Sequence, residues 1–234
     1  MTIASTWQRL RASLANSAGT VVFGMEDGTV SIFGLIFGVA ATTSSRETIL
    51  VAGASGAVAA AVSMMAGAYL DVETTRDRIK ANRALLQTDA TLDSSTLAAS
   101  LSNRLAKAGL TPEQSAALSG AVRQDRKALS GLLAALQGAP EAPLNPWEQA
   151  LWMLFADFAA AAVPILPFVL FSVPQARVVS GAVTLALLVA LGVGRARIAN
   201  RGTLRTVVET VSIGIAAALA GVIIGVLIDR GFNG

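Results

Sequence analysis

Long runs of apolar residues dominate the pattern of the chain. Five of them approach the length of about 20 residues that an α-helix needs to cross a hydrocarbon core about 30 Å thick. They cover residues 20–42, 49–70, 147–171, 178–194 and 206–228. The pattern therefore predicts an all-α, polytopic membrane protein with five transmembrane helices.

The segment between the second and third runs, residues 71–146, is polar but has a helical period. Its large apolar residues recur at spacings of three and four, which is typical of amphipathic helices. They are Leu97, Leu101, Leu105, Leu118, Val122, Leu129, Leu132 and Leu133. One helix is expected to end at Gly109, and the next to be capped by Thr111 with Pro112 in its first turn. We therefore expect an insertion of two or three helices.

The predicted organisation follows the order of these segments. An N-terminal segment, 1–19, precedes the first two transmembrane helices in 20–70. The helical insertion, 71–146, leads to the last three transmembrane helices in 147–228, and 229–234 form the C-terminal end.

The positions of lysine and arginine predict the orientation, because these residues concentrate on the cytoplasmic side. A cytoplasmic N-terminus places 15 of the 18 on that side, together with the insertion, and leaves the C-terminus outside. Arg9 and Arg11 are not followed by an apolar core and a cleavage site, so no removable signal peptide is expected. The Ala- and Arg-rich composition favours a bacterial inner (plasma) membrane.

Composition narrows the chemistry. The chain is 53% hydrophobic and 14% charged and has neither cysteine nor histidine, which excludes disulfides, thiolate catalysis, histidine triads and the usual zinc sites. It contains no nucleophile–base pair, phosphate-binding glycine loop or cofactor motif, so we expect neither an enzyme nor a bound cofactor. The net charge of +3 is explained by basic residues that flank membrane helices, so it implies no nucleic-acid partner.

Four of the acidic residues in the apolar runs are candidates for function, because an ionisable side chain there costs several kcal/mol unless it has a partner or faces a cavity. They are Glu26, Asp27, Asp157 and Glu209. Glu209 lies three residues from a predicted helix start and can reach the interface. Asp157 lies near the predicted midplane and is either a proton carrier or a hydrogen-bonded packing residue.

Asp27 and Met64 are predicted to lie at similar depth, about 10 Å from the cytoplasmic edge. A carboxylate and a thioether together favour a borderline ion such as Fe²⁺ over Ca²⁺ or Mg²⁺. The alternatives are that Met64 fills the core and that Asp27 caps a helix or pairs with an arginine. Glu26 lies about 100° around the helix from Asp27, so the two cannot share one narrow site. Glu26 and Met65 are second choices for the pathway.

Small residues four apart predict close helix packing in the membrane. The pairs are Gly24 with Gly28, Gly34 with Gly38, and Gly221 with Gly225. Some of these contacts could instead join two copies of the chain.

Several stretches resemble the vacuolar iron transporter family. Asp27-Gly28-Thr29-Val30-Ser31, with the glycines that follow, resembles the first-helix signature of that family, and 61–70 resembles the end of its second helix. Asn145-Pro146-Trp147 and 164–168 resemble its third helix. The resemblance implies a five-helix homodimer that moves Fe²⁺, sometimes Mn²⁺, out of the cytosol in exchange for protons. By the same resemblance Asp27 and Met64 line the pathway.

The sequence also departs from that family. Positions where relatives often carry pathway acids are Thr20 and Gly56 here, and the insertion has no methionine and no glutamate between Glu73 and Glu113. A cluster that collects metal is therefore not expected in the insertion, and Glu26 or Asp157 would have to replace the missing acids. Two hypotheses follow: a divalent-metal exporter, or a membrane scaffold or accessory subunit that keeps the fold without transport.

Overall fold

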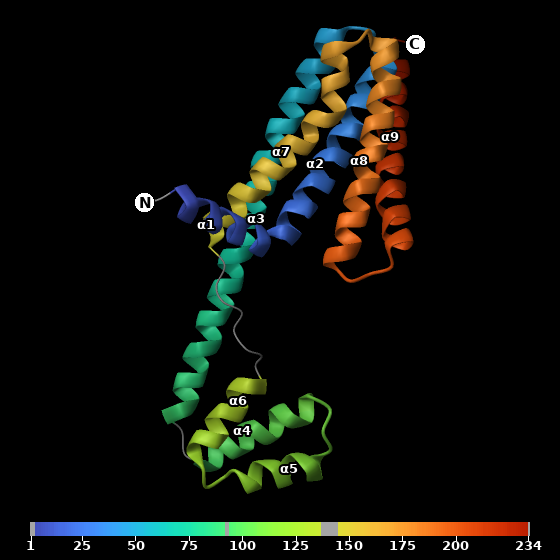
Figure 1. The fold of residues 1–234 in the computed structure, drawn as a ribbon. Coiled ribbons are helices and arrows are strands. Elements are labelled where there is room, and N and C mark those ends of the chain that lie inside the picture. The colour runs from blue at the N-terminus through green and yellow to red at the C-terminus, as the bar shows by residue number, and fades with distance from the viewer. Residues whose placement is uncertain (1–2, 92–93, 137–144, 234) are drawn as a thin grey trace. The chain divides into compact units, whose positions relative to one another are not determined.

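The computed structural model describes residues 3–91, 94–136 and 145–233, and within them every regular element is an α-helix (Figure 1). The helices are α1 (Ile3–Asn16), α2 (Ala18–Thr42), α3 (Arg46–Thr91), α4 (Ser94–Lys107), α5 (Pro112–Ala121), α6 (Arg126–Leu136), α7 (Pro146–Leu170), α8 (Val173–Ile198) and α9 (Thr203–Asn233). The all-α prediction is confirmed.

Five helices are long and apolar enough to cross a bilayer, as predicted. The spanning segments are Ala18–Thr42, Arg46–Ala81, Pro146–Leu170, Val173–Ile198 and Thr203–Gly231. The protein is therefore an integral membrane protein, with the short helices α4, α5 and α6 between its second and third spans.

Several boundaries differ from the predicted ones, and the fifth span, expected over 206–228, lies in α9, which covers Thr203–Asn233. The fourth span was expected over 178–194, but α8 begins at Val173, with Pro174 in its first turn, and has 26 residues. The second was expected to end at residue 70, but α3 continues to Thr91. The change to polar residues does not stop this helix, because neither glycine nor proline occurs between residues 68 and 91.

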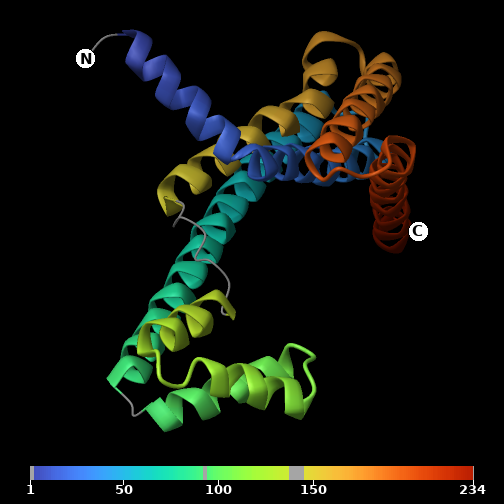
Figure 2. The same ribbon diagram turned by 60° about the horizontal axis from the view of Figure 1, so that its bottom comes forward.

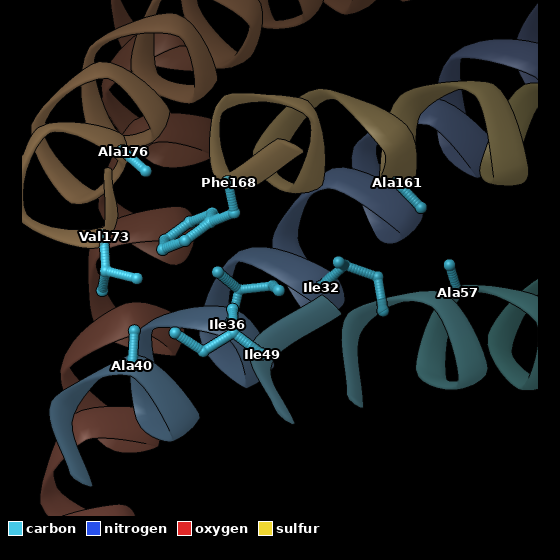
Figure 3. Close-up of a cluster of buried hydrophobic side chains, with 9 residues drawn as sticks. All are labelled: Ile32, Ile36, Ala40, Ile49, Ala57, Ala161, Phe168, Val173 and Ala176. Atoms are coloured by element: carbon cyan, nitrogen blue, oxygen red, sulfur yellow. The ribbon is translucent and has the colours of Figure 1, made fainter. Parts of the chain in front are cut away.

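The chain forms two compact units, and the first comprises residues 1–70 and 145–234. In this unit α2 packs against α7, α8 and α9 (Figures 1 and 2). Figure 3 shows the core at one end of the bundle, where Phe168 of α7 lies among aliphatic side chains of neighbouring helices. These include Ile32, Ile36, Ile49 and Val173.

Glycine faces allow α2 to approach its neighbours closely. A Cβ added at Gly38 would lie 2.7 Å from the carbonyl oxygen of Gly221 on α9, and one added at Gly225 would meet the carbonyl oxygen of Gly38. On the other side a Cβ at Gly28 would collide with the backbone of Asp157 on α7. The predicted close packing at the three glycine pairs is confirmed, and these contacts lie within one chain.

Side chains bond to backbone oxygens at the end of the bundle near Thr42. Arg46 Nε donates to the carbonyl of Phe168 at 2.6 Å, and Arg177 donates to the carbonyls of Ala40 and Thr43. Ser180 Oγ donates to the carbonyl of Pro164 at 2.8 Å, beside the two prolines inside α7. These bonds satisfy backbone groups where helices end or are interrupted.

The second unit, residues 71–144, contains α4, α5 and α6. Five buried leucines form its core: Leu97, Leu101, Leu105, Leu129 and Leu133. Thr111 caps α5 in a capping box with Gln114, and Gly109 has a positive φ of 102°. The predicted helix boundary between Gly109 and Thr111 is confirmed. Leu118 and Leu132, however, are exposed, so α5 and α6 bury a narrower face than the leucine spacing suggests.

We expect Gly38→Ala to lower the free energy of unfolding by about 1–3 kcal/mol, because its methyl group would press on a backbone carbonyl that cannot rotate away. Gly67→Ala is the matched control, since a Cβ there meets nothing within 4 Å. It should leave stability unchanged or raise it by a few tenths of a kcal/mol. Unfolding in detergent measures both, and equal stability of the two variants would contradict the described α2–α9 packing.

Candidate functional site

The acidic stretch of α2 borders a pocket of about 370 Å³ between α2, α8 and α9. Apolar side chains such as Val22, Val30 and Ile213 make most of its wall. The charged residues on the wall are Glu26, Asp27 and Arg195. A pocket with charged residues among apolar walls, opening on the surface of a membrane-spanning bundle, is a candidate functional site.

Glu26 is already paired. Its Oε1 lies 3.1 Å from Arg195 Nη1 of α8 and accepts a hydrogen bond of 3.1 Å from Thr210 Oγ1 of α9. The side chain of Arg195 is 36% exposed, so water or lipid headgroups can still reach it. The interaction joins three helices and compensates the charge of Glu26.

Asp27 differs from its neighbour. It is partly buried on the same wall, and it has no hydrogen bond or salt bridge to any residue that the structure describes. Glu26 and Asp27 border one pocket despite the 100° between them, because the pocket is wide rather than a narrow site. Asp27 is therefore the carboxylate on this wall that remains available to a ligand.

Asp157 of α7 is fully buried, and its two carboxyl oxygens have no hydrogen-bond partner among the described residues. Its backbone lies against Gly28, the residue after Asp27, and it is close enough to Asp27 for their charges to repel. The predicted role as a hydrogen-bonded packing residue is therefore not supported, because no described residue bonds to the carboxyl oxygens of Asp157.

The predicted methionines lie elsewhere. Met64 and Met65 are partly buried on α3, and neither borders the pocket that contains Asp27. The structure thus brings together Glu26 and Asp27, with Asp157 nearby, but it does not join them to the methionines.

Thr20 and Gly56, which stand where relatives often carry pathway acids, make structural contacts here. Thr20 Oγ1 donates to Gln149 Oε1 at 2.6 Å. A Cβ at Gly56 would meet the side chain of Leu35 on α2, so Gly56 lies in close contact with that helix. Among the described residues no group of three or more acidic side chains is placed to hold a metal ion.

Sequence reasoning missed Arg195 and Thr210. Arg195 was counted only as a basic residue that flanks a membrane helix, and Thr210 was not singled out. The available signal was the high cost of an unpaired acid at Glu26, which demands a partner but does not say which helix supplies it.

Comparison with known proteins identifies the family of this chain. The profile of the VIT family matches residues 18–226. The chain belongs to the VIT family. The matched residues include α2 and the parts of α8 and α9 that border the pocket. Helix α1 lies before the first matched residue.

Relatives in the VIT family are distant. Vacuolar iron transporter 1 of Arabidopsis thaliana is 26% identical over 205 residues, which cover 86% of this chain and 81% of the relative. The vacuolar iron transporter of Centaurea cyanus is 26% identical over 204 residues, with coverage of 86% and 83%. Vacuolar iron transporter 1 of Tulipa gesneriana is 27% identical over 205 residues, with coverage of 86% and 82%.

A double-mutant cycle should show that the Glu26–Arg195 pair stabilises the bundle. We expect Glu26→Gln and Arg195→Gln each to lower the free energy of unfolding, with a coupling of about 1 kcal/mol because the carboxylate is largely shielded from water. The control cycle uses Glu209→Gln and Arg205→Gln, whose arginine is 86% exposed. Thermal unfolding in detergent gives both couplings, and a pocket pair no stronger than the control pair would refute this role.

Proposed function

We propose that this VIT-family protein exports a divalent metal, Fe²⁺ foremost and Mn²⁺ as a second substrate, from the cytosol. The observation that carries the proposal is Asp27, an uncompensated carboxylate on the wall of a pocket between the membrane-spanning helices α2, α8 and α9. The names of the relatives, which are iron transporters, support the choice of metal. A carboxylate oxygen attracts a divalent cation strongly where the surroundings are apolar.

In this proposal Asp27 is the charged ligand and Glu26 is not, because Arg195 already compensates Glu26. Met64 and Met65 provide thioether ligands at a different stage of the passage, since they lie on α3 outside the pocket. At that stage a thioether sulfur, as a softer ligand than a carboxylate oxygen, favours Fe²⁺ over Ca²⁺ or Mg²⁺.

Asp157 is proposed as the proton carrier of a metal–proton antiport. Its buried carboxyl group has no described hydrogen-bond partner and lies near Asp27. Two nearby acids that repel each other are a suitable pair for exchanging one bound cation against protons, because a proton or a metal ion relieves the same repulsion.

The proposed orientation has the N-terminus and the insertion in the cytoplasm of a bacterial cell, with the protein in its inner membrane. The excess of lysine and arginine on that side supports it. We further propose a homodimer as the working unit, as the family resemblance implies. In the apolar 18-residue window of the α3 span only 22% of the residues are buried, which leaves apolar surface for lipid or for a second copy.

We expect Asp27→Asn to abolish Fe²⁺ and Mn²⁺ flux, because the amide removes the charge while keeping the shape. Flux is measured in proteoliposomes of purified protein, with and without a proton gradient. Asp77→Asn is the control, since it removes the same charge from an exposed pair with Lys80 that does not border the pocket. Wild-type flux in Asp27→Asn would refute the role of Asp27.

A second prediction separates the proton carrier from a packing residue. We expect Asp157→Asn to be at least as stable as the wild type, because it removes a buried carboxyl group that lacks a described partner. The same variant should lose the acceleration of metal flux by a proton gradient. Lower stability with normal proton coupling would instead make Asp157 a structural residue.

A non-transporting scaffold or accessory subunit is the second candidate. It is favoured by the lack of any acidic cluster for metal among the described residues and by the use of Gly56 in helix packing. It predicts no metal flux from well-folded wild-type protein, and no effect of Asp27→Asn on metal handling in cells.

A further inference from the structure

The N-terminal helix α1 carries an apolar stripe with no described protein partner to cover it. Trp7, Leu10 and Leu14 lie within about 60° of one another around the helix, given about 100° per residue. Their side chains are 63%, 46% and 42% exposed. Three large apolar side chains on one face of a 14-residue helix form a surface that water solvates poorly.

The aromatic residues show where this helix lies along the bundle. The chain has three tryptophans and one tyrosine; Tyr69, Trp147 and Trp152 lie at the end where α7 begins, and Trp7 is on α1. The rings of Tyr69 and Trp147 lie 4.9 Å apart, and Trp152 Nε1 donates to Ser13 Oγ of α1 at 2.8 Å. Because tryptophan and tyrosine concentrate at membrane–water interfaces, this end of the bundle marks an interface, and α1 is bonded to it.

The junction between α1 and α2 is fixed by buried polar contacts. Ser17 separates the two helices, and its Oγ accepts a hydrogen bond of 2.8 Å from Gln149 Nε2, whose Oε1 in turn accepts one from Thr20. Figure 2 shows α1 leaving the line of α2 at this point. A helix that turns away from a membrane-spanning helix at the level of the interface is placed to lie along the membrane surface.

The charge of α1 suits a phospholipid surface. Arg9 and Arg11 are its charged side chains, and the first acidic residue of the chain is Glu26. Arg11 is exposed and lies about 40° from Trp7 around the helix, so its guanidinium can reach phosphates while the stripe faces the acyl chains. Basic residues beside an apolar stripe favour membranes with anionic lipids.

We propose that α1 is an interfacial helix that lies in the headgroup layer, with Trp7, Leu10 and Leu14 inserted toward the acyl chains and Arg11 at the lipid phosphates. The helix then sits with its apolar face about 5–10 Å into the boundary between headgroups and chains. Its partner is the phospholipid bilayer, and anionic phospholipids strengthen the contact. The proposal does not depend on transport.

The lack of cysteine permits a direct test, because a single introduced cysteine is the only site that a thiol-reactive spin label can modify. The full chain is labelled at Leu10→Cys or Leu14→Cys and reconstituted in vesicles that contain phosphatidylglycerol. Ala12→Cys is the control, since Ala12 is exposed and lies on the opposite face from Leu10. Collision with oxygen, which dissolves in the bilayer, is compared with collision with a water-soluble nickel chelate.

The labels at positions 10 and 14 should have an oxygen-to-nickel collision ratio several-fold higher than the label at position 12. Equal, water-like ratios at all three positions would overturn the proposal, because the stripe would then lie in water. Low collision with both reagents at 10 and 14 would also overturn it, since a second copy or another protein would then cover the stripe.

The dependence on lipid charge provides the second measurement. Replacing phosphatidylglycerol by phosphatidylcholine, or Arg11 by glutamine, should lower the ratio at position 10. If neither the lipid replacement nor Arg11→Gln changes the collision ratio, the proposed role of Arg11 and of anionic lipid is overturned. The insertion of the apolar stripe is tested separately, by the comparison of positions 10 and 14 with position 12.

Discussion

The close contact of α2 with the backbones of α7 and α9 is the constraint on which the rest of the bundle depends. Lipid offers no hydrophobic gain for bringing helices together, so their attraction has to come from van der Waals contact between closely packed small residues. Gly28 lies against α7 and Gly38 against α9, so the two sides of α2 are in van der Waals contact along its length. Because α2 is held centrally in this way, Glu26 and Thr29 on it lie against other helices rather than lipid.

This central position explains how one helix carries two adjacent acids through a bilayer. Glu26 is compensated by Arg195 and Thr210, which come from helices that the glycine contacts bring near. Asp27 instead borders the pocket, and Asp157 lies behind Gly28 on the other side. The same small side chains that give cohesion thus bring three acidic residues into one region of the bundle.

The sequence predicted those features that depend on neighbours along the chain. Run lengths located five spans, and the threonine-proline pair at 111 and 112 located the start of α5. Contacts between distant segments were harder. The spacing of Gly221 and Gly225 predicted close packing but did not show that α2 is the partner. The leucine spacing around Leu118 predicted an apolar helix face but did not show how much of that face is buried.

The sequence likewise predicted only part of the candidate site. Asp27 and Asp157 could be selected from the sequence because an acid in an apolar run is costly wherever it lies. The pairing of Glu26 with Arg195 could not, because these residues are 169 positions apart and the depth of Arg195 depends on the true length of α8. The short prediction for that helix left Arg195 beyond the span.

The balance of charge in the pocket bears on how a transported ion would leave it. Glu26 and Arg195 cancel, so Asp27 is left as the main negative charge on the wall. A transport site has to bind its ion strongly enough to capture it and weakly enough to release it. One uncompensated carboxylate among apolar walls holds a divalent ion less tightly than a cluster of acids would. On the proposed function, the missing acids at positions 20 and 56 therefore weaken capture but ease release.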